Sequence, residues 1–168
     1  VLYSEEAPED FHARFSAKNK SYRYTVQCGP HADVFCRNTA LHFHTPLDLD
    51  KMQAAAKDAL GEHDFFAFMS AGSTIEHTIR TISRSQWSQN GQLFYYDVSA
   101  NGFLYNMVRI LAGTMLEIGS GKLPPDAIGR AIESKRRADA GATAPPQGLM
   151  LMRVQYADFD TDEVLRRL

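Results

Sequence analysis

Residues 79–119, IRTISRSQWSQNGQLFYYDVSANGFLYNMVRILAGTMLEIG, decide the fold of this chain. Two strand-like segments, Ile79–Ser88 and Gln92–Ala100, flank the dipeptide Asn90-Gly91. That dipeptide tolerates the positive φ angles of a type I′ turn and is a strong signal for a β-hairpin. The centre of the chain is therefore predicted to be an antiparallel pair of strands.

A helix follows the hairpin directly. Asn101-Gly102 is predicted to end the second strand and to open a helix that runs to about Ile118. The glycines Gly119 and Gly121 stop it, because glycine readily leaves the helical conformation. A second helix is predicted to start at the pair Pro124-Pro125 and to run to about Lys135.

Further elements lie on both sides of this centre. Upstream, a strand rich in Tyr, Thr and Val and a weaker strand precede a helix with Asp48 as its N-cap and Gly61 as its stop. That helix has an apolar face of Met52, Ala55, Ala56, Ala59 and Leu60. The remaining predicted elements are the strands Ser21–Cys28, Leu41–His44 and Gly148–Tyr156, the terminal helix Asp160–Leu168, the irregular segment Gly61–Ser70 and the surface loop Ala71–His77.

This order of elements indicates the α+β class. We expect an antiparallel or mixed sheet of about four to five strands with helices packed on one face. A chain of 168 residues is long enough for one compact domain with its own hydrophobic core, so residues 1–168 are predicted to form a single domain.

The composition excludes several classes of protein. No apolar run reaches the roughly 18 residues that span a bilayer, and Val1–Asp10 is too acidic for a signal peptide. Cys28 and Cys36 are too few for a disulfide framework or a metal cage and suit reduced thiols in a cytoplasmic protein. The net charge is −2, but four basic residues and no acid lie between Phe11 and Tyr24. Basic residues interleaved with aromatic ones suit phosphates and stacked bases, although a solvated strand face has the same composition.

Short catalytic motifs are absent from the sequence. There is no phosphate-binding glycine loop, no G-x-S-x-G, no H-E-x-x-H and no paired C-x-x-C. Three histidines, His42, His44 and His63, are weak evidence for a metal site, so we predict no metal. A small-molecule enzyme that uses these histidines is the least favoured function.

Longer stretches carry more information. They are DFHARFSAKNKSYRY (10–24), GEHDFFAF (61–68), NGFLYNMVRILAG (101–113) and TAPPQGL (143–149), together with Arg80-Thr81-Ile82. In order and spacing they resemble the second half of the TruA family of bacterial-type tRNA pseudouridine synthases, over essentially the whole chain from Glu9 to about Tyr156.

The resemblance implies a function and its partners. The family isomerises uridine to pseudouridine in the anticodon stem-loop of tRNA, at positions 38 to 40, without any cofactor. Its members resemble two related halves joined into one sheet with the active cleft between them, and they act as cytoplasmic homodimers. The family's nucleophilic aspartate lies in an R-T-D-A-G-V-H type motif of the first half, and no such motif occurs here. We therefore expect a C-terminal half that lacks the catalytic Asp and is inactive alone.

The resemblance also assigns Arg109 as the catalytic residue of this half, since the family arginine pairs with the nucleophilic aspartate. Such a pair keeps a carboxylate ionised and oriented. Arg109 lies among apolar neighbours in the sequence, where burying a permanent cation without a partner costs free energy. By itself this pattern also fits a helix arginine that extends to solvent.

Substrate-binding residues are implied at two further places. Tyr22 corresponds to the tyrosine that contacts the flipped target base, whereas Tyr24 is expected to be a core tyrosine. Gly148-Leu149 resembles the turn that lines the floor of the pocket, although a core leucine is equally compatible with the sequence. We expect the helix of Arg109 to pack near Tyr22 and Leu149.

RNA contacts are implied for the residues Phe11, His12, Ala13, Arg14 and Phe15, with Arg14 as the phosphate or base ligand. The loop Gly72–Glu76 matches another such segment but carries no basic residue. Arg80 is either an RNA contact or a structural residue. The alternative to an enzyme half is a non-catalytic RNA-binding module that uses the surface of Phe11–Arg23.

Overall fold

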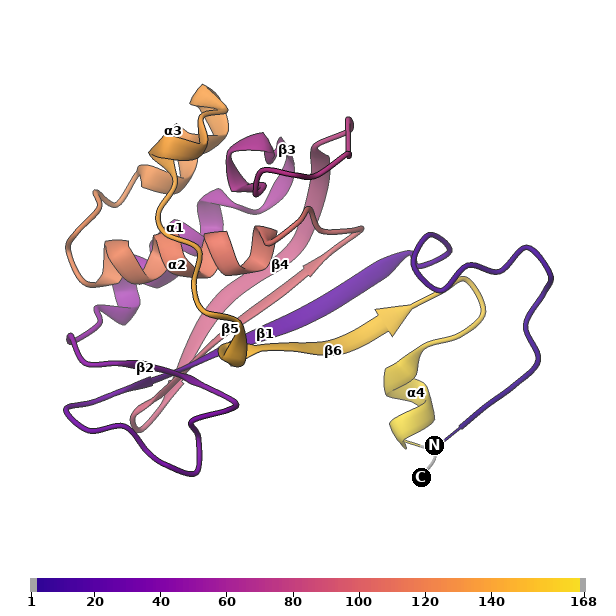
Figure 1. Ribbon diagram of the computed structural model, residues 1–168, viewed down its shortest axis with the longest axis horizontal. Coiled ribbons are helices and arrows are strands. Elements are labelled where there is room, and N and C mark those ends of the chain that lie inside the picture. The colour runs from indigo at the N-terminus through magenta and orange to yellow at the C-terminus, as the bar shows by residue number, and fades with distance from the viewer. Residues whose placement is uncertain (1–2, 167–168) are drawn as a thin grey trace.

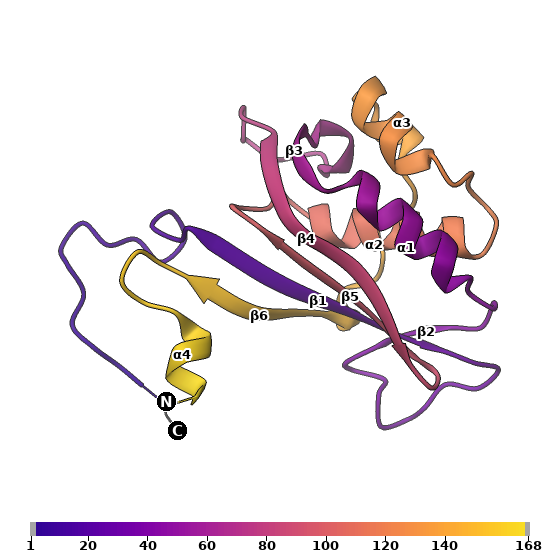
Figure 2. The same ribbon diagram turned by 180° about the vertical axis from the view of Figure 1, so that it is seen from behind.

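The computed structural model describes residues 3–166 and shows a mixed six-stranded sheet (Figure 1). Helices α1, α2 and α3 cover one face, and the short helix α4 lies beyond the far end of β6 (Figures 1 and 2). The α+β class is confirmed. The strands are β1 Asn19–Cys28, β2 Leu41–Phe43, β3 Gly61–Asp64, β4 Ile79–Asn90, β5 Leu93–Ala100 and β6 Leu149–Gln155, and the helices are α1 Leu49–Asp58, α2 Met107–Gly119, α3 Ala127–Ser134 and α4 Thr161–Arg166.

Strand β1 lies inside the sheet, and both of its edges are paired. One of its edges pairs with β5 in antiparallel orientation over residues 20–27. Its other edge is shared, because β2 pairs in parallel with Val26–Cys28 and β6 pairs in antiparallel orientation with residues 19–24. The full order is β2-β1-β5-β4-β3, with β6 beside β1. Two segments far apart in sequence, β1 and β6, therefore lie next to each other.

The predicted hairpin is confirmed, but its turn differs from the prediction. Asn90 still pairs with Leu93, so Gly91 and Gln92 form the two-residue loop. Among residues 3–166 only Asn106 and Lys135 are non-glycine residues with positive φ, whereas Gly91 has a φ of 59°. A type I′ turn needs positive φ at both loop residues, so that prediction is wrong. Glycine at the first loop position is the requirement of a type II′ turn.

Helix α1 begins where the sequence predicts. The side chain of Asp48 accepts a hydrogen bond from the backbone N–H of Lys51 and so satisfies one of the free donors of the first turn. The predicted apolar residues are buried against α2 and β4, except that Leu60 is 39% exposed. Leu60 lies beyond the last turn of α1, where the helical periodicity no longer applies.

Helix α2 begins at Met107, later than the predicted start at Asn101-Gly102. Its N-cap is Asn106, which has a left-handed backbone with φ of 61°. The segment from Gly102 to Leu104 has no regular secondary structure, and it leads through Tyr105 to this cap. As a result, Arg109 lies in the first turn of the helix rather than in its middle.

The sheet has one strand more than the four to five expected. The additional strand is β3, which pairs with the start of β4 inside a segment predicted to be irregular. The predicted C-terminal helix is present as α4, and the last two positions of that prediction, 167 and 168, lie outside the described residues.

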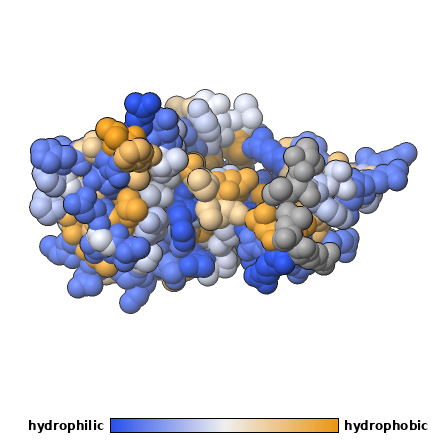
Figure 3. Space-filling model, turned by 90° about the horizontal axis from the view of Figure 1, so that it is seen from below, coloured by the Kyte–Doolittle hydropathy of each residue, from blue (hydrophilic) through white to orange (hydrophobic). Residues whose placement is uncertain are grey.

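Apolar side chains are exposed on the outer surface, above all on β6. Three consecutive apolar side chains of the edge strand β6, those of Met150, Leu151 and Met152, are each at least 42% exposed. Seen from below, apolar patches interrupt the polar surface (Figure 3). Within residues 3–166, no helix has the length and apolar character that crossing a bilayer requires.

Candidate active site

A cavity of about 640 Å³ lies beside the N-terminal end of α2. Segments from distant parts of the sequence line it, namely Arg14, Tyr22, residues 71–75, residues 103–109 and Leu149. The predicted proximity of Arg109, Tyr22 and Leu149 is thereby confirmed. The lining contains two arginines and no acidic residue among the described positions, so the cavity is suited to an anionic group.

Two neutral acceptors hold the guanidinium of Arg109. Its Nε donates to the carbonyl of Ala144 at 2.7 Å, and its Nη1 donates to Oδ1 of Asn106 at 2.9 Å. The ion pairs found among residues 3–166 do not include Arg109. A guanidinium has five N–H donors. The donors of Nη2 and the second donor of Nη1 therefore remain for a group outside this part of the chain.

Arg109 lies at the N-terminal end of α2, which adds to the positive electrostatic field around it. The N-terminal turn of a helix carries unpaired N–H groups equivalent to a partial positive charge. A cation there is disfavoured by about 0.3–1 kcal/mol, whereas an anion is favoured. Arg109 thus gains nothing from the helix dipole, but together they make a strong site for a carboxylate or a phosphate.

Residues 141–145, here named the strap, fix Arg109 from the side. The N–H of Ala144 donates to the backbone carbonyl of Arg109 at 3.0 Å, and the N–H of Gly141 donates to Oγ1 of Thr114 at 2.9 Å. The strap packs directly on α2 at Gly113, where a Cβ atom would lie 1.9 Å from the carbonyl oxygen of Ala142. Only glycine permits this approach.

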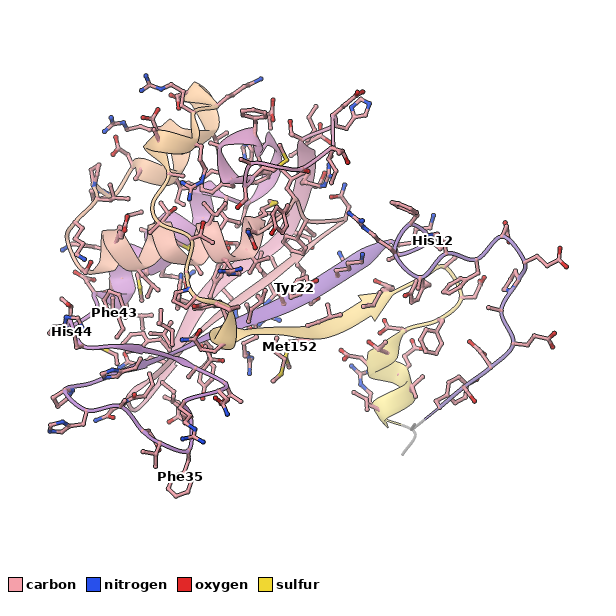
Figure 4. All side chains as sticks on the ribbon, in the orientation of Figure 1. His12, Tyr22, Phe35, Phe43, His44 and Met152 are labelled. Atoms are coloured by element: carbon pink, nitrogen blue, oxygen red, sulfur yellow. The ribbon has the colours of Figure 1, made fainter. Side chains whose placement is uncertain are left out.

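Tyr22 lies on β1 (Figure 4), between Val98 of β5 and Leu151 of β6. Its ring is half-buried and meets the ring of Phe103 edge to face, with centroids 5.3 Å apart. Burial raises the pKa of the Tyr22 hydroxyl, so the phenol stays neutral at physiological pH. A neutral aromatic ring at the wall of a cavity is suited to contact a flat base.

Tyr24, two residues further along β1, belongs to the core. Tyr24 is fully buried, as predicted for a core residue, and its hydroxyl donates to the carbonyl of Pro145 in the strap at 2.6 Å. Gly148 is buried as well and does not line the cavity. A Cβ atom at Gly148 would lie 2.6 Å from the carbonyl oxygen of Thr25, so this glycine lets the chain approach β1. Leu149, the next residue, reaches the cavity.

The residues predicted to bind RNA form an exposed turn before β1. His12 lies beyond the start of β1 (Figure 4), and its Nδ1 accepts hydrogen bonds from the N–H groups of Arg14 and Phe15. Phe15 is 74% exposed, and Phe11 packs on Tyr156. The turn is tied to the end of β6, since the hydroxyl of Tyr156 donates to the carbonyl of Ala13. Of these five residues, only Arg14 lines the cavity.

Two further sequence features now have a place. Residues 71–75 of the predicted surface loop form one wall of the cavity. Arg80 lies outside the cavity lining, and its Nη1 donates to the carbonyls of His77 and Ile79 at the end of this loop. Its contacts are those of a structural residue.

The described part of the chain offers no cluster of cation ligands. No group of three or more His, Cys, Asp or Glu side chains within residues 3–166 could hold a metal ion. Cys28 and Cys36 are free thiols, both half-buried.

The sequence predicts no role for Asn106, Phe103 or the strap, although the stretches 101–113 and 143–149 contain Asn106, Phe103 and part of the strap. Asn106 and the strap touch Arg109 directly, and Phe103 touches Tyr22. The strap has a local pattern that indicates close packing. Its sequence, Gly-Ala-Thr-Ala-Pro, consists of small residues, and α2 also has small residues at Ala112 and Gly113. Such residues allow two backbones to approach closely.

The sequence of this chain is similar to those of known proteins. A family profile described as tRNA pseudouridine synthase matches residues 55–157. The protein named tRNA pseudouridine synthase A of Moorella thermoacetica is 47% identical over 156 residues, which is 93% of this chain and 63% of the relative. The proteins of the same name from Geobacillus sp. and Bacillus subtilis are 47% and 44% identical over 152 and 156 residues, covering 90% and 93% of this chain. The chain thus spans 61–63% of the length of these relatives.

Proposed function

The chain belongs to the tRNA pseudouridine synthase family, and on that premise we propose that it is one half of an enzyme that isomerises uridine in tRNA. In this proposal it is the C-terminal half of a longer protein whose other half supplies the nucleophilic aspartate. The observation that supports it most is the cavity with Arg109, Tyr22 and Leu149 on its wall and no acidic residue in the described lining.

The free donors of Arg109 define how a carboxylate would approach. Because Nε is bonded to Ala144, the fork formed by Nε and Nη2 cannot bind both oxygens of a carboxylate. The remaining donors lie on Nη1 and Nη2, so the carboxylate would approach the end of the guanidinium. Bonding there would keep the carboxylate ionised, as a nucleophile requires.

The target uridine would lie between this pair and Tyr22. A base must leave its stack before an enzyme can act on its glycosidic bond. The ring of Tyr22, supported by Phe103, offers a flat surface, and Leu149 offers an apolar one. In the proposed reaction the bond from the ribose to uracil N1 breaks, the held base rotates, and a new bond forms from the ribose to C5. C5 loses its proton, and N1 gains one. The atoms balance without a cofactor.

Arg14 would contact the nucleic acid outside the base pocket. It lines the same cavity from the exposed turn of residues 11–15, and the carbonyl of Arg14 accepts a hydrogen bond from Nζ of Lys20. Lys20 itself does not line the cavity, but two neighbouring cations suit consecutive phosphates. We extend the proposal to the anticodon stem-loop as the substrate and to a cytoplasmic homodimer as the working form, as the family resemblance implies.

The test compares the isolated 168-residue chain with the full-length protein. Tritium release from tRNA labelled at C5 of uridine measures the reaction directly. We expect turnover by the full-length protein, and none by the isolated chain once circular dichroism shows that it is folded. Steady turnover by the isolated chain would overturn the proposal of an incomplete site. A full-length protein that binds tRNA without releasing tritium would instead support the non-catalytic RNA-binding module.

A further inference from the structure

Asn106 breaks a local rule of helix structure. Asparagine at an N-cap normally has an extended backbone and accepts a hydrogen bond from the second or third N–H of the helix. Asn106 instead has φ of 61° and ψ of 9°, and its side chain makes no capping bond. The left-handed conformation is uncommon for residues other than glycine. Departures of this kind concentrate at functional sites.

The side chain of Asn106 bridges two other groups. Its Oδ1 accepts from Nη1 of Arg109 at 2.9 Å, and its Nδ2 donates to Oγ of Ser70 at 3.0 Å. Ser70 directly precedes the loop of residues 71–75, and its N–H also donates to the carbonyl of Tyr105. Asn106 thus connects the cavity arginine with the start of the loop that forms another wall of the cavity.

The side-chain amide of Asn106 accepts the hydrogen bond from Arg109 but carries no charge. Asn106 restrains the guanidinium without neutralising its charge, and the left-handed backbone directs the amide toward Arg109 instead of the helix N–H groups. We propose that Asn106 is a positioning residue that orients Arg109 toward the aspartate of the other half and couples this orientation to the loop of residues 71–75. This inference rests on the proposed function.

Substitutions in the full-length enzyme separate this role from a merely structural one. Asn106→Asp has the same shape and tolerates the left-handed conformation equally well, so a structural role predicts nearly normal activity. A positioning role predicts a loss, because the new carboxylate would pair with Arg109 and compete with the catalytic aspartate. We expect kcat to fall about a hundredfold with KM for tRNA changed less than about twofold.

Asn106→Gly provides a second variant that keeps the backbone. Glycine adopts φ of 61° without strain, so the melting temperature should be maintained while the amide is lost. We expect kcat to fall about tenfold, in line with one lost hydrogen bond to a charged group. Ser70→Ala, which removes only the outer partner of the amide, should have a smaller effect in the same direction.

Asn101→Asp is the matched control. It adds the same charge at the other end of the segment before α2, where the side chain accepts from the N–H of Thr81 and does not line the cavity. We expect it to retain normal kcat. An Asn106→Asp enzyme with kcat within about threefold of normal, beside an inactive Arg109→Lys enzyme, would overturn the inference and leave the proposed function intact. An active Arg109→Lys enzyme would overturn the proposed function itself. A raised KM with normal kcat in Asn106→Asp would also overturn the inference, because it would make Asn106 a substrate contact.

Discussion

Arg23 lies on the open face of the sheet, whereas Arg109 belongs to α2 on the face that the helices cover. The two guanidinium groups have different hydrogen-bond partners. Arg23 donates from Nε and Nη2 to both oxygens of Asp97, at 2.8 and 2.9 Å, and its guanidinium lies 4.9 Å from the ring centroid of Tyr95. The hydrogen bond to Asp97 raises the pKa of Arg23 further above its ordinary value. Arg109 has the carbonyl of Ala144 and the amide of Asn106, but no carboxylate within residues 3–166.

This difference separates a structural arginine from a candidate catalytic one. A planar guanidinium gains most from a carboxylate that meets two of its donors at once, and the open face of the sheet supplies one to Arg23. At Arg109 the protein instead supplies neutral groups that fix the orientation and leave the charge available. A fold that only needed to satisfy Arg109 could have placed an acid there, as it does for Arg23.

The largest expected effect comes from exchanging each arginine for lysine in the full-length enzyme. Arg109→Lys should lower kcat by about a hundredfold or more, because lysine lacks the planar fork and cannot keep both the Ala144 and the Asn106 contacts. Arg23→Lys should leave kcat nearly unchanged. Tritium release and a thermal melt of both variants give the comparison. Equal losses of activity in the two variants would remove the distinction between the faces.

The next effect is on stability and concerns the strap that holds Arg109. Gly113→Ala should lower the free energy of unfolding by about 1–3 kcal/mol, because the new methyl group would overlap the carbonyl oxygen of Ala142. The matched control is Gly129→Ala on α3, where no atom of the described residues lies within 4 Å of the position that a Cβ atom would take. Alanine there should stabilise the helix by about 0.5–1 kcal/mol. Urea titration measures both, and similar values for the two variants would contradict the close packing of the strap.

The sequence predicted those parts of the fold that depend on local patterns. Residue types that act within a few positions determine the α1 cap at Asp48, the position of the β4–β5 hairpin and strand β1. The start of α2 does not, since a left-handed asparagine before the helix depends on contacts with Ser70 and Arg109. Strand β3 was missed because four residues paired with the start of β4 carry too short a pattern.

The sequence also predicted part of the candidate site. Family resemblance pointed to Arg109, Tyr22 and Leu149, and the fold brings them to one cavity. The roles of Phe103 and the strap could not be predicted, because their contacts lie across the fold. Asn106 is only three residues from Arg109, but its bond to Ser70 depends on the fold. Gly148 has a role in packing against β1 that spacing alone does not distinguish from lining a pocket.

A smaller effect on stability is expected from removing the partner of Arg23. Asp97→Asn would remove the charge that faces both Arg23 and Arg84, the latter at 3.4 Å. Since 37% of the Arg23 side chain is exposed, solvent screens the pair, and the free energy of unfolding should fall by only about 1 kcal/mol. kcat should stay normal. A loss of activity without loss of stability would show that the open face of the sheet also takes part in the reaction.

The smallest effect concerns the rim of the cavity and the binding of tRNA. Arg14 is the residue of the exposed turn that reaches the cavity, and its guanidinium lies 5.4 Å from the ring centroid of Phe15. If Arg14 contacts one phosphate, Arg14→Ala should weaken binding a few-fold and lower the slope of log K against log salt by about one. Arg130→Ala removes the same charge from the exposed side of α3, away from the cavity, and should leave the slope unchanged. Titrations of the full-length protein with tRNA at several salt concentrations measure both slopes. Equal slopes for the two variants would mean that Arg14 contributes only to the general field of the protein, and the proposed path of the RNA over residues 11–15 would then be wrong.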